Sequence, residues 1–90
     1  MENLEIKQLV HDISVLKEKY RYYQNCQEIA KRDYNMWDPY DGLTKDQHEQ
    51  KYGNEIASNR YVLNSLEKQI KECRKKLKQA NREQNKKREA

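Results

Sequence analysis

Residues that are mostly apolar recur along this chain with alternating spacings of three and four, and this repeat limits the folds open to it more than any other feature. The first half carries them at Ile6, Leu9, Ile13, Leu16, Tyr20, Tyr23, Gln27, Ala30 and Tyr34. The second half repeats the spacing at Tyr52, Ile56, Asn59, Leu63, Leu66, Ile70, Cys73, Leu77 and Ala80. A 3.5-residue repeat indicates a coiled-coil seam. Each half is therefore predicted to be one long helix.

The composition and the positions of the helix-breaking residues favour two long helices over a compact globular fold. Hydrophobic residues make up 34% of the chain and charged residues 38%, which is too little apolar mass for a globular core. The one proline and both glycines lie between positions 39 and 53. The sequence predicts an all-α, antiparallel two-helix hairpin over 1–90, with helices at about 3–33 and 44–86 and a turn at 34–43.

The seam also predicts how the helices face each other. If Ile6 faces Cys73, then Leu16 faces Leu63 and Gln27 faces Tyr52, and every seam residue meets another. Residues 78–90 would then form a basic overhang without an intrachain partner. A capping box from Thr44 to Gln47 is expected to begin the second helix.

One narrow seam is a weak core, so further packing surfaces are expected. On the first helix, Val15, Tyr22 and Ile29 form a stripe with seven-residue spacing, which we call the flank. It could support self-association into a helical bundle or the docking of another protein. We expect the turn to contribute a second protein-interaction surface through its large side chains, Tyr34, Met36, Trp37 and Tyr40. Trp37 could equally plug the open end of the seam.

Charge is divided along the chain. Residues 1–67 carry nine Lys/Arg against twelve Asp/Glu, whereas residues 68–90 carry ten against three. The basic segment could bind nucleic acid without sequence preference, bind an acidic protein surface, or only solubilise the chain, and its cations are expected on several helix faces. The candidate contacts are Lys71, Arg74, Lys75, Lys78, Arg82 and Lys86.

Catalytic and metal-binding patterns are missing from the sequence. It has no Gly-rich phosphate loop, nucleophile motif or metal-ligand spacing, and His11 and His48 read as exposed polar residues. We expect a non-enzymatic interaction protein without cofactors: an adaptor, chaperone-like partner or inhibitor of a larger complex. Reduced Cys26 and Cys73 and the lack of a long apolar run predict a cytoplasmic protein without a membrane partner.

The order helix, Trp-containing turn, helix resembles the small hairpin proteins of the WXG type. Those proteins carry Trp-x-Gly in the turn, whereas here Trp37 is followed by Asp38-Pro39 and the glycine comes at Gly42. The resemblance implies, as an alternative function, a partner of substrates of a bacterial secretion system.

Overall fold

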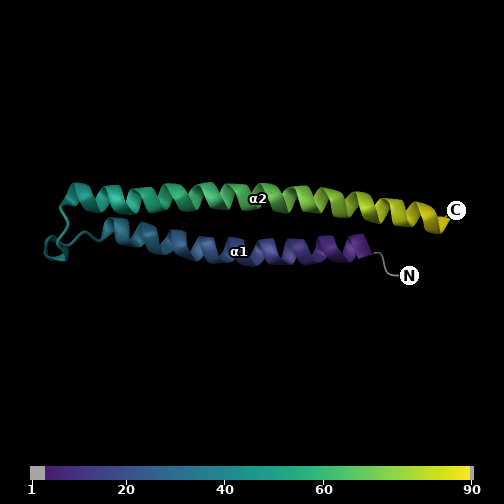
Figure 1. Cartoon of the computed structure of the whole chain (residues 1–90), viewed down its shortest axis with the longest axis horizontal. Helices are drawn as coiled ribbons and strands as arrows, with labels where there is room; N and C mark the ends of the chain where they lie inside the picture. Colours follow the sequence, from purple (N-terminus) through teal and green to yellow (C-terminus); the bar gives the residue numbers. More distant parts are fainter. Residues whose placement is uncertain (1–3, 90) are drawn as a thin grey trace.

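The computed structural model describes residues 4–89, with side chains described up to residue 86, and it is a helical hairpin (Figure 1). Helix α1 spans Leu4–Asn35, the short 3-10 helix η1 spans Pro39–Asp41, and helix α2 spans Lys45–Glu89. The described residues contain no strand. The two long helices run antiparallel in a rod of 71 × 16 × 13 Å. The predicted fold class is confirmed.

Both helix ends at the turn are closed by local hydrogen bonds. The Thr44 hydroxyl accepts from the Gln47 backbone N–H at 3.2 Å, and the Thr44 N–H donates to the Gln47 side chain at 3.0 Å. This reciprocal pair is the predicted capping box. Helix α1 runs two residues further than expected and ends where the Met36 N–H donates to the Asp33 carbonyl. The ring of Tyr34, in this added part of α1, lies over Gly53 of the second helix.

The predicted facing of the helices is wrong by about one heptad. Gln27 donates to the backbone carbonyl of Ile56 at 3.0 Å, not to Tyr52. The ring of Tyr34 lies 3.8 Å from the point where a Cβ at Gly53 would stand, although the predicted facing put residue 34 near residue 45. A slide of seven residues brings seam residues onto seam residues again, so the apolar pattern fits both arrangements equally well.

The observed facing buries a thin core along the rod. The buried apolar side chains among the described residues are Leu9, Ile13, Ala30, Leu66, Ile70 and Ala80. No large side chain among them is fully buried. Ala80 is only 6% exposed, so the covered part of α2 continues past position 78, where the overhang was expected to begin.

Candidate interaction sites at the tip and along helix α2

The connector 36–44, which we call the tip, is a turn held in one conformation by its own polar groups. The Asp38 carboxylate accepts from the Tyr40 N–H at 2.9 Å, and the Asp38 carbonyl accepts from the Asp41 N–H at 3.1 Å. Pro39 begins η1, where its fixed φ suits a first helical position. Gly42 ends it in the left-handed region at φ 79°, which a side chain would disfavour.

The Trp37 side chain stabilises the tip by a hydrogen bond that joins its two ends. Its indole N–H donates to the Leu43 carbonyl at 3.1 Å, and 38% of the residue stays exposed. Tyr34 lies near the end of α1, is also 38% exposed, and packs over Gly53 of α2. These two aromatic residues therefore lie at the base of the tip and partly cover it, while each keeps some surface open to solvent.

Tyr40 and Met36 project from the same turn. Tyr40 is 94% exposed, the highest value among the large hydrophobic residues described, and Met36 is 64% exposed. The structure thus brings the four predicted tip residues together at one end of the rod. Trp37 and Tyr34 stabilise the base of the turn, whereas Tyr40 and Met36 face solvent.

His48 was expected to be an exposed polar residue, and this prediction is wrong. It is buried, at 3% exposure, and its Nε2 lies 2.7 Å from the Asp33 carbonyl oxygen. Because a carbonyl only accepts, Nε2 must carry the proton. The ring also packs on Tyr52, with the centroids 4.6 Å apart. The signal was present: His48 lies four residues before Tyr52 and continues the seam spacing by one turn.

The flank runs along one side of α1, beginning beside α2. Val15 is half-buried beside α2, whereas Tyr22 and Ile29 are exposed. The Tyr22 ring meets Tyr23 edge-on at 5.3 Å between centroids. A hydrogen bond with the Cys26 side chain, assisted by charge effects from Cys26 and Tyr23, raises the pKa of the Tyr22 hydroxyl.

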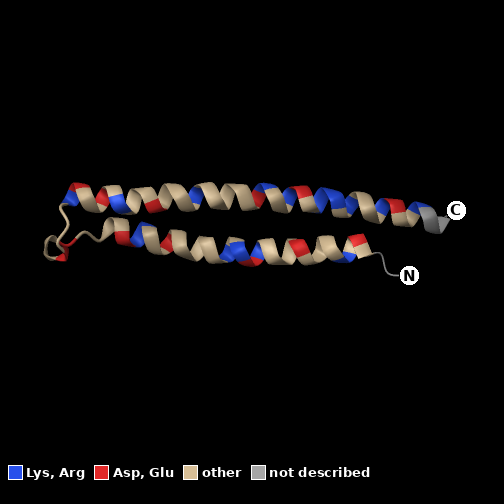
Figure 2. Ribbon diagram, viewed as in Figure 1, with Lys and Arg blue, Asp and Glu red and all other residues tan. Residues whose placement is uncertain are grey.

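Positive charge gathers toward the C-terminal half of α2 (Figure 2). Five of the six predicted cations follow one another at steps of three or four and share a helix face, so they form one line. Other cations of the basic segment, such as Lys76, lie on other faces, as expected. We call this line the basic stripe: Lys71, Lys75, Lys78, Arg82 and Lys86. The sixth predicted cation, Arg74, lies at its edge and also reaches the hollow beside Tyr20 of α1.

Few counter-charges neutralise the basic stripe. Lys71 pairs with Glu67 at 3.5 Å, both side chains being more than half exposed. Among the described residues no ion pair engages the other four cations. Shallow surface hollows separate the side chains, with Gln79 and Glu83 between them. The stripe therefore presents mostly uncompensated charge along one edge of the rod.

Among the side chains that the structure describes, no group of three or more His, Cys, Asp or Glu residues is placed to hold a metal ion. Cys26 and Cys73 are free thiols, both half-buried. None of the described helices is long and apolar enough to cross a membrane. No family model matches the chain, and neither a curated protein nor a solved structure matches it.

Proposed function

We propose that this hairpin is a non-enzymatic docking module that inserts its tip into a pocket on a larger protein, as an adaptor, chaperone-like partner or inhibitor. The observation that carries the proposal is Tyr40, which is 94% exposed on a turn that hydrogen bonds hold in place. A large aromatic residue in full contact with water serves no packing role within the chain. Tyrosine is also among the residues that most often dominate binding energies at protein interfaces.

The rigidity of the tip favours binding. A loop that must be ordered on binding loses affinity through the entropy of its side chains and backbone, whereas a preformed turn avoids that cost. Asp38, Trp37 and Thr44 each fix part of the turn through the hydrogen bonds described above. The tip therefore presents Tyr40 and Met36 in a defined geometry.

The surroundings of Tyr40 indicate the chemistry of the partner. Asp38 and Asp41 flank it in the sequence, and both are exposed. A complementary pocket would be apolar at its base, to receive the ring and Met36, and would carry Lys or Arg at its rim. We infer that the partner offers a hollow of this kind rather than a flat acidic surface.

Capture experiments with matched variants test this proposal. The immobilised chain is compared with Tyr40→Ala and with Val10→Ala, which removes an exposed apolar side chain of α1 far from the tip. A protein retained by the wild type and by Val10→Ala, but lost with Tyr40→Ala at unchanged helicity, is the expected result. Retention by Tyr40→Ala equal to that of the wild type would contradict docking through the tip.

The basic stripe supports a second candidate function, the binding of a nucleic-acid backbone without sequence preference. Its ends, Lys71 and Lys86, are fifteen residues apart, which is about 22 Å along a helix. Cations aligned over this length can displace counterions from several successive phosphates. This candidate uses the opposite end of the rod from the tip, so the two functions can be tested separately.

A further inference from the structure

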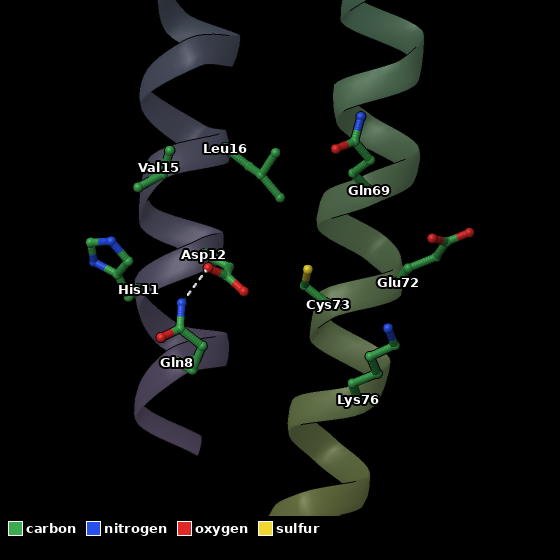
Figure 3. Close-up of a pocket in the computed structure, with 9 residues that line it drawn as sticks. All are labelled: Gln8, His11, Asp12, Val15, Leu16, Gln69, Glu72, Cys73 and Lys76. Atoms are coloured by element: carbon green, nitrogen blue, oxygen red, sulfur yellow. Dashed lines mark hydrogen bonds between the residues drawn. The ribbon is translucent and has the colours of Figure 1, made fainter. Parts of the chain in front are cut away.

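One broad side of the hairpin contains a groove between the two helices (Figure 3). Residues between Gln8 and Leu16 of α1 line one wall, and residues between Gln69 and Lys76 of α2 line the other. Cys73 lies at the level of Asp12 and contributes to the floor. The groove mixes apolar surface with polar groups that can accept or donate hydrogen bonds.

The same side carries a ridge of exposed large side chains closer to the tip. Seven-residue steps from Val15, a wall residue of the groove, lead to Tyr22 and Ile29, which therefore lie on its side of α1. Tyr61 stands eleven residues, about three helical turns, before Glu72, a wall residue of the groove, and so lies on the same side of α2. Tyr22 is 64% exposed, Ile29 49% and Tyr61 76%. We call these three residues the ridge.

Groove and ridge lie at equal distances from one point on α1. The groove extends over positions 8–16 and the ridge over positions 22–29, so their midpoint falls between Glu18 and Lys19. A two-fold rotation about an axis through that point places each ridge over the groove of the other copy. Tyr22 then meets Val15, and Ile29 meets Gln8. A surface that complements itself in this way fits an isologous dimer.

We propose that this side binds a second copy of the chain, giving an antiparallel four-helix bundle with the two tips at opposite ends. The ridge tyrosines would place their rings on apolar surface and their hydroxyls near Gln69, Glu72 and His11 of the second copy. Tyrosine suits such a half-polar groove because it has an apolar body and a polar end.

Charge favours the antiparallel orientation. A parallel pair would set the two basic ends of α2 side by side. The antiparallel pair sets each against the tip half of the other copy, where residues 28–55 carry seven Asp/Glu against four Lys/Arg. At the axis itself, Glu18 of each copy faces Lys19 of the other. Opposite charges on facing surfaces fix orientation more than they add affinity.

The hairpin also needs more burial than its own seam provides. Its buried apolar side chains are few, and two of the six are alanines. A side of the rod measuring 71 Å by 16 Å offers about 1,100 Å² per copy. Stable protein interfaces bury about 800 Å² per partner, so this side is large enough for one.

Light scattering coupled to size exclusion tests the dimer. One chain has a mass of 11.0 kDa, so the wild type is expected at about twice that value. Tyr22→Glu should halve the mass, because it puts a charge into the ridge, while Tyr40→Glu in the tip should leave it unchanged. Circular dichroism is recorded on each variant to verify that the helices are retained. A wild type that stays monomeric at the highest attainable concentration overturns the proposal.

Single cysteines test the orientation, whether or not Tyr22→Glu folds. In a chain carrying Cys26→Ser and Cys73→Ser, Lys19→Cys lies next to the axis and is expected to form a disulfide-linked dimer on oxidation. Gln8→Cys should not, since its two copies would stand about 32 Å apart. Arg21→Cys, on another face of α1, is the control that should stay unlinked. Cross-linking through Gln8→Cys, or no cross-linking through Lys19→Cys, overturns the antiparallel arrangement.

Discussion

His48 closes the C-terminal end of α1 by placing its Nε2 2.7 Å from the carbonyl oxygen of Asp33, fifteen residues earlier. Helix ends leave their last carbonyls without intrahelical donors, and a buried end needs a partner from elsewhere. The Asp33 carbonyl already accepts from the Met36 N–H, and the second helix supplies a further, side-chain donor to it. The contact fixes where α2 begins relative to the end of α1, and hence the path of the tip.

Removal of this contact is expected to destabilise the hairpin. His48→Ala leaves the Asp33 carbonyl without its side-chain donor and removes the ring that packs on Tyr52, so the free energy of unfolding should fall by about 1–3 kcal/mol. Urea unfolding followed by circular dichroism measures the change. Gln24→Ala serves as the control because Gln24 is exposed and lies outside the groove. Equal midpoints for the two variants would show that the contact does not stabilise the fold.

Gln27 is expected to govern the facing of the helices at some cost in stability. It is buried at 8% exposure, and its Nε2 is bonded to Ile56 whereas its Oε1 has no partner among the described residues. Gln27→Leu removes the unpartnered oxygen and adds apolar contact, so stability should be unchanged or higher by about 1 kcal/mol. The same change removes the side-chain hydrogen bond that joins the two helices at this level.

Spin labels can detect the resulting slippage. Arg21→Cys and Asn64→Cys, both exposed, are labelled in a chain without Cys26 and Cys73 and diluted with unlabelled protein. Gln27→Leu should add a second distance population, because a slide of one heptad displaces the helices by about 10 Å. A single sharp population with Gln27→Leu would show that the tip alone sets the alignment.

The two glycines are expected to respond in opposite directions to substitution by alanine. At Gly53 the added Cβ would stand 3.8 Å from the Tyr34 ring, an ordinary contact, so Gly53→Ala should stabilise α2 by about 1 kcal/mol. Gly42 has φ 79°, so Gly42→Ala should destabilise the tip by about 1–2 kcal/mol. Thermal unfolding of both variants measures the contrast, and a lower midpoint for Gly53→Ala would mean that the ring cannot adjust.

If the basic stripe binds nucleic acid, charge reversal within it should reduce the salt dependence of binding. Lys75→Glu, Lys78→Glu and Arg82→Glu together remove three phosphate contacts, which should lower the slope of log K against log salt by about 2.7 for duplex DNA. Fluorescence anisotropy with a mixed-sequence duplex at several salt concentrations measures the slope. Lys31→Glu, Lys45→Glu and Lys51→Glu change the net charge equally near the tip and should alter it far less. Equal slopes for the two triple variants would exclude the stripe as the contact surface.

The hairpin architecture was readable from the sequence, and the pairing of its helices was not. The spacing of Leu9, Ile13 and their counterparts predicts two helices and a turn because any arrangement of the chain must bury that seam. Thr44 and Gln47 likewise gave a local signal for the start of α2. The alignment depends on His48, Gln27 and the path of the tip, and these are contacts between distant residues that a repeating pattern cannot specify.

The candidate sites were likewise predictable from the sequence only in part. The gathering of Tyr34, Met36, Trp37 and Tyr40 followed from their closeness in sequence, but their division into braces and exposed side chains depends on the bond from Trp37 to Leu43. The basic stripe could have been found by counting steps of three and four from Lys71. The groove could not, because its two walls come from different helices and require the correct alignment.

Because the seam repeats every seven residues, the length of this hairpin can change in steps of one heptad. Removing one heptad from α1 together with the heptad that faces it in α2 would leave every remaining seam contact, the contact of His48 and the tip unchanged. It would shorten the span between Tyr40 and the basic stripe by about 10 Å. The number of heptads therefore sets how far apart this molecule can hold whatever engages its two ends, independently of how tightly either end is bound.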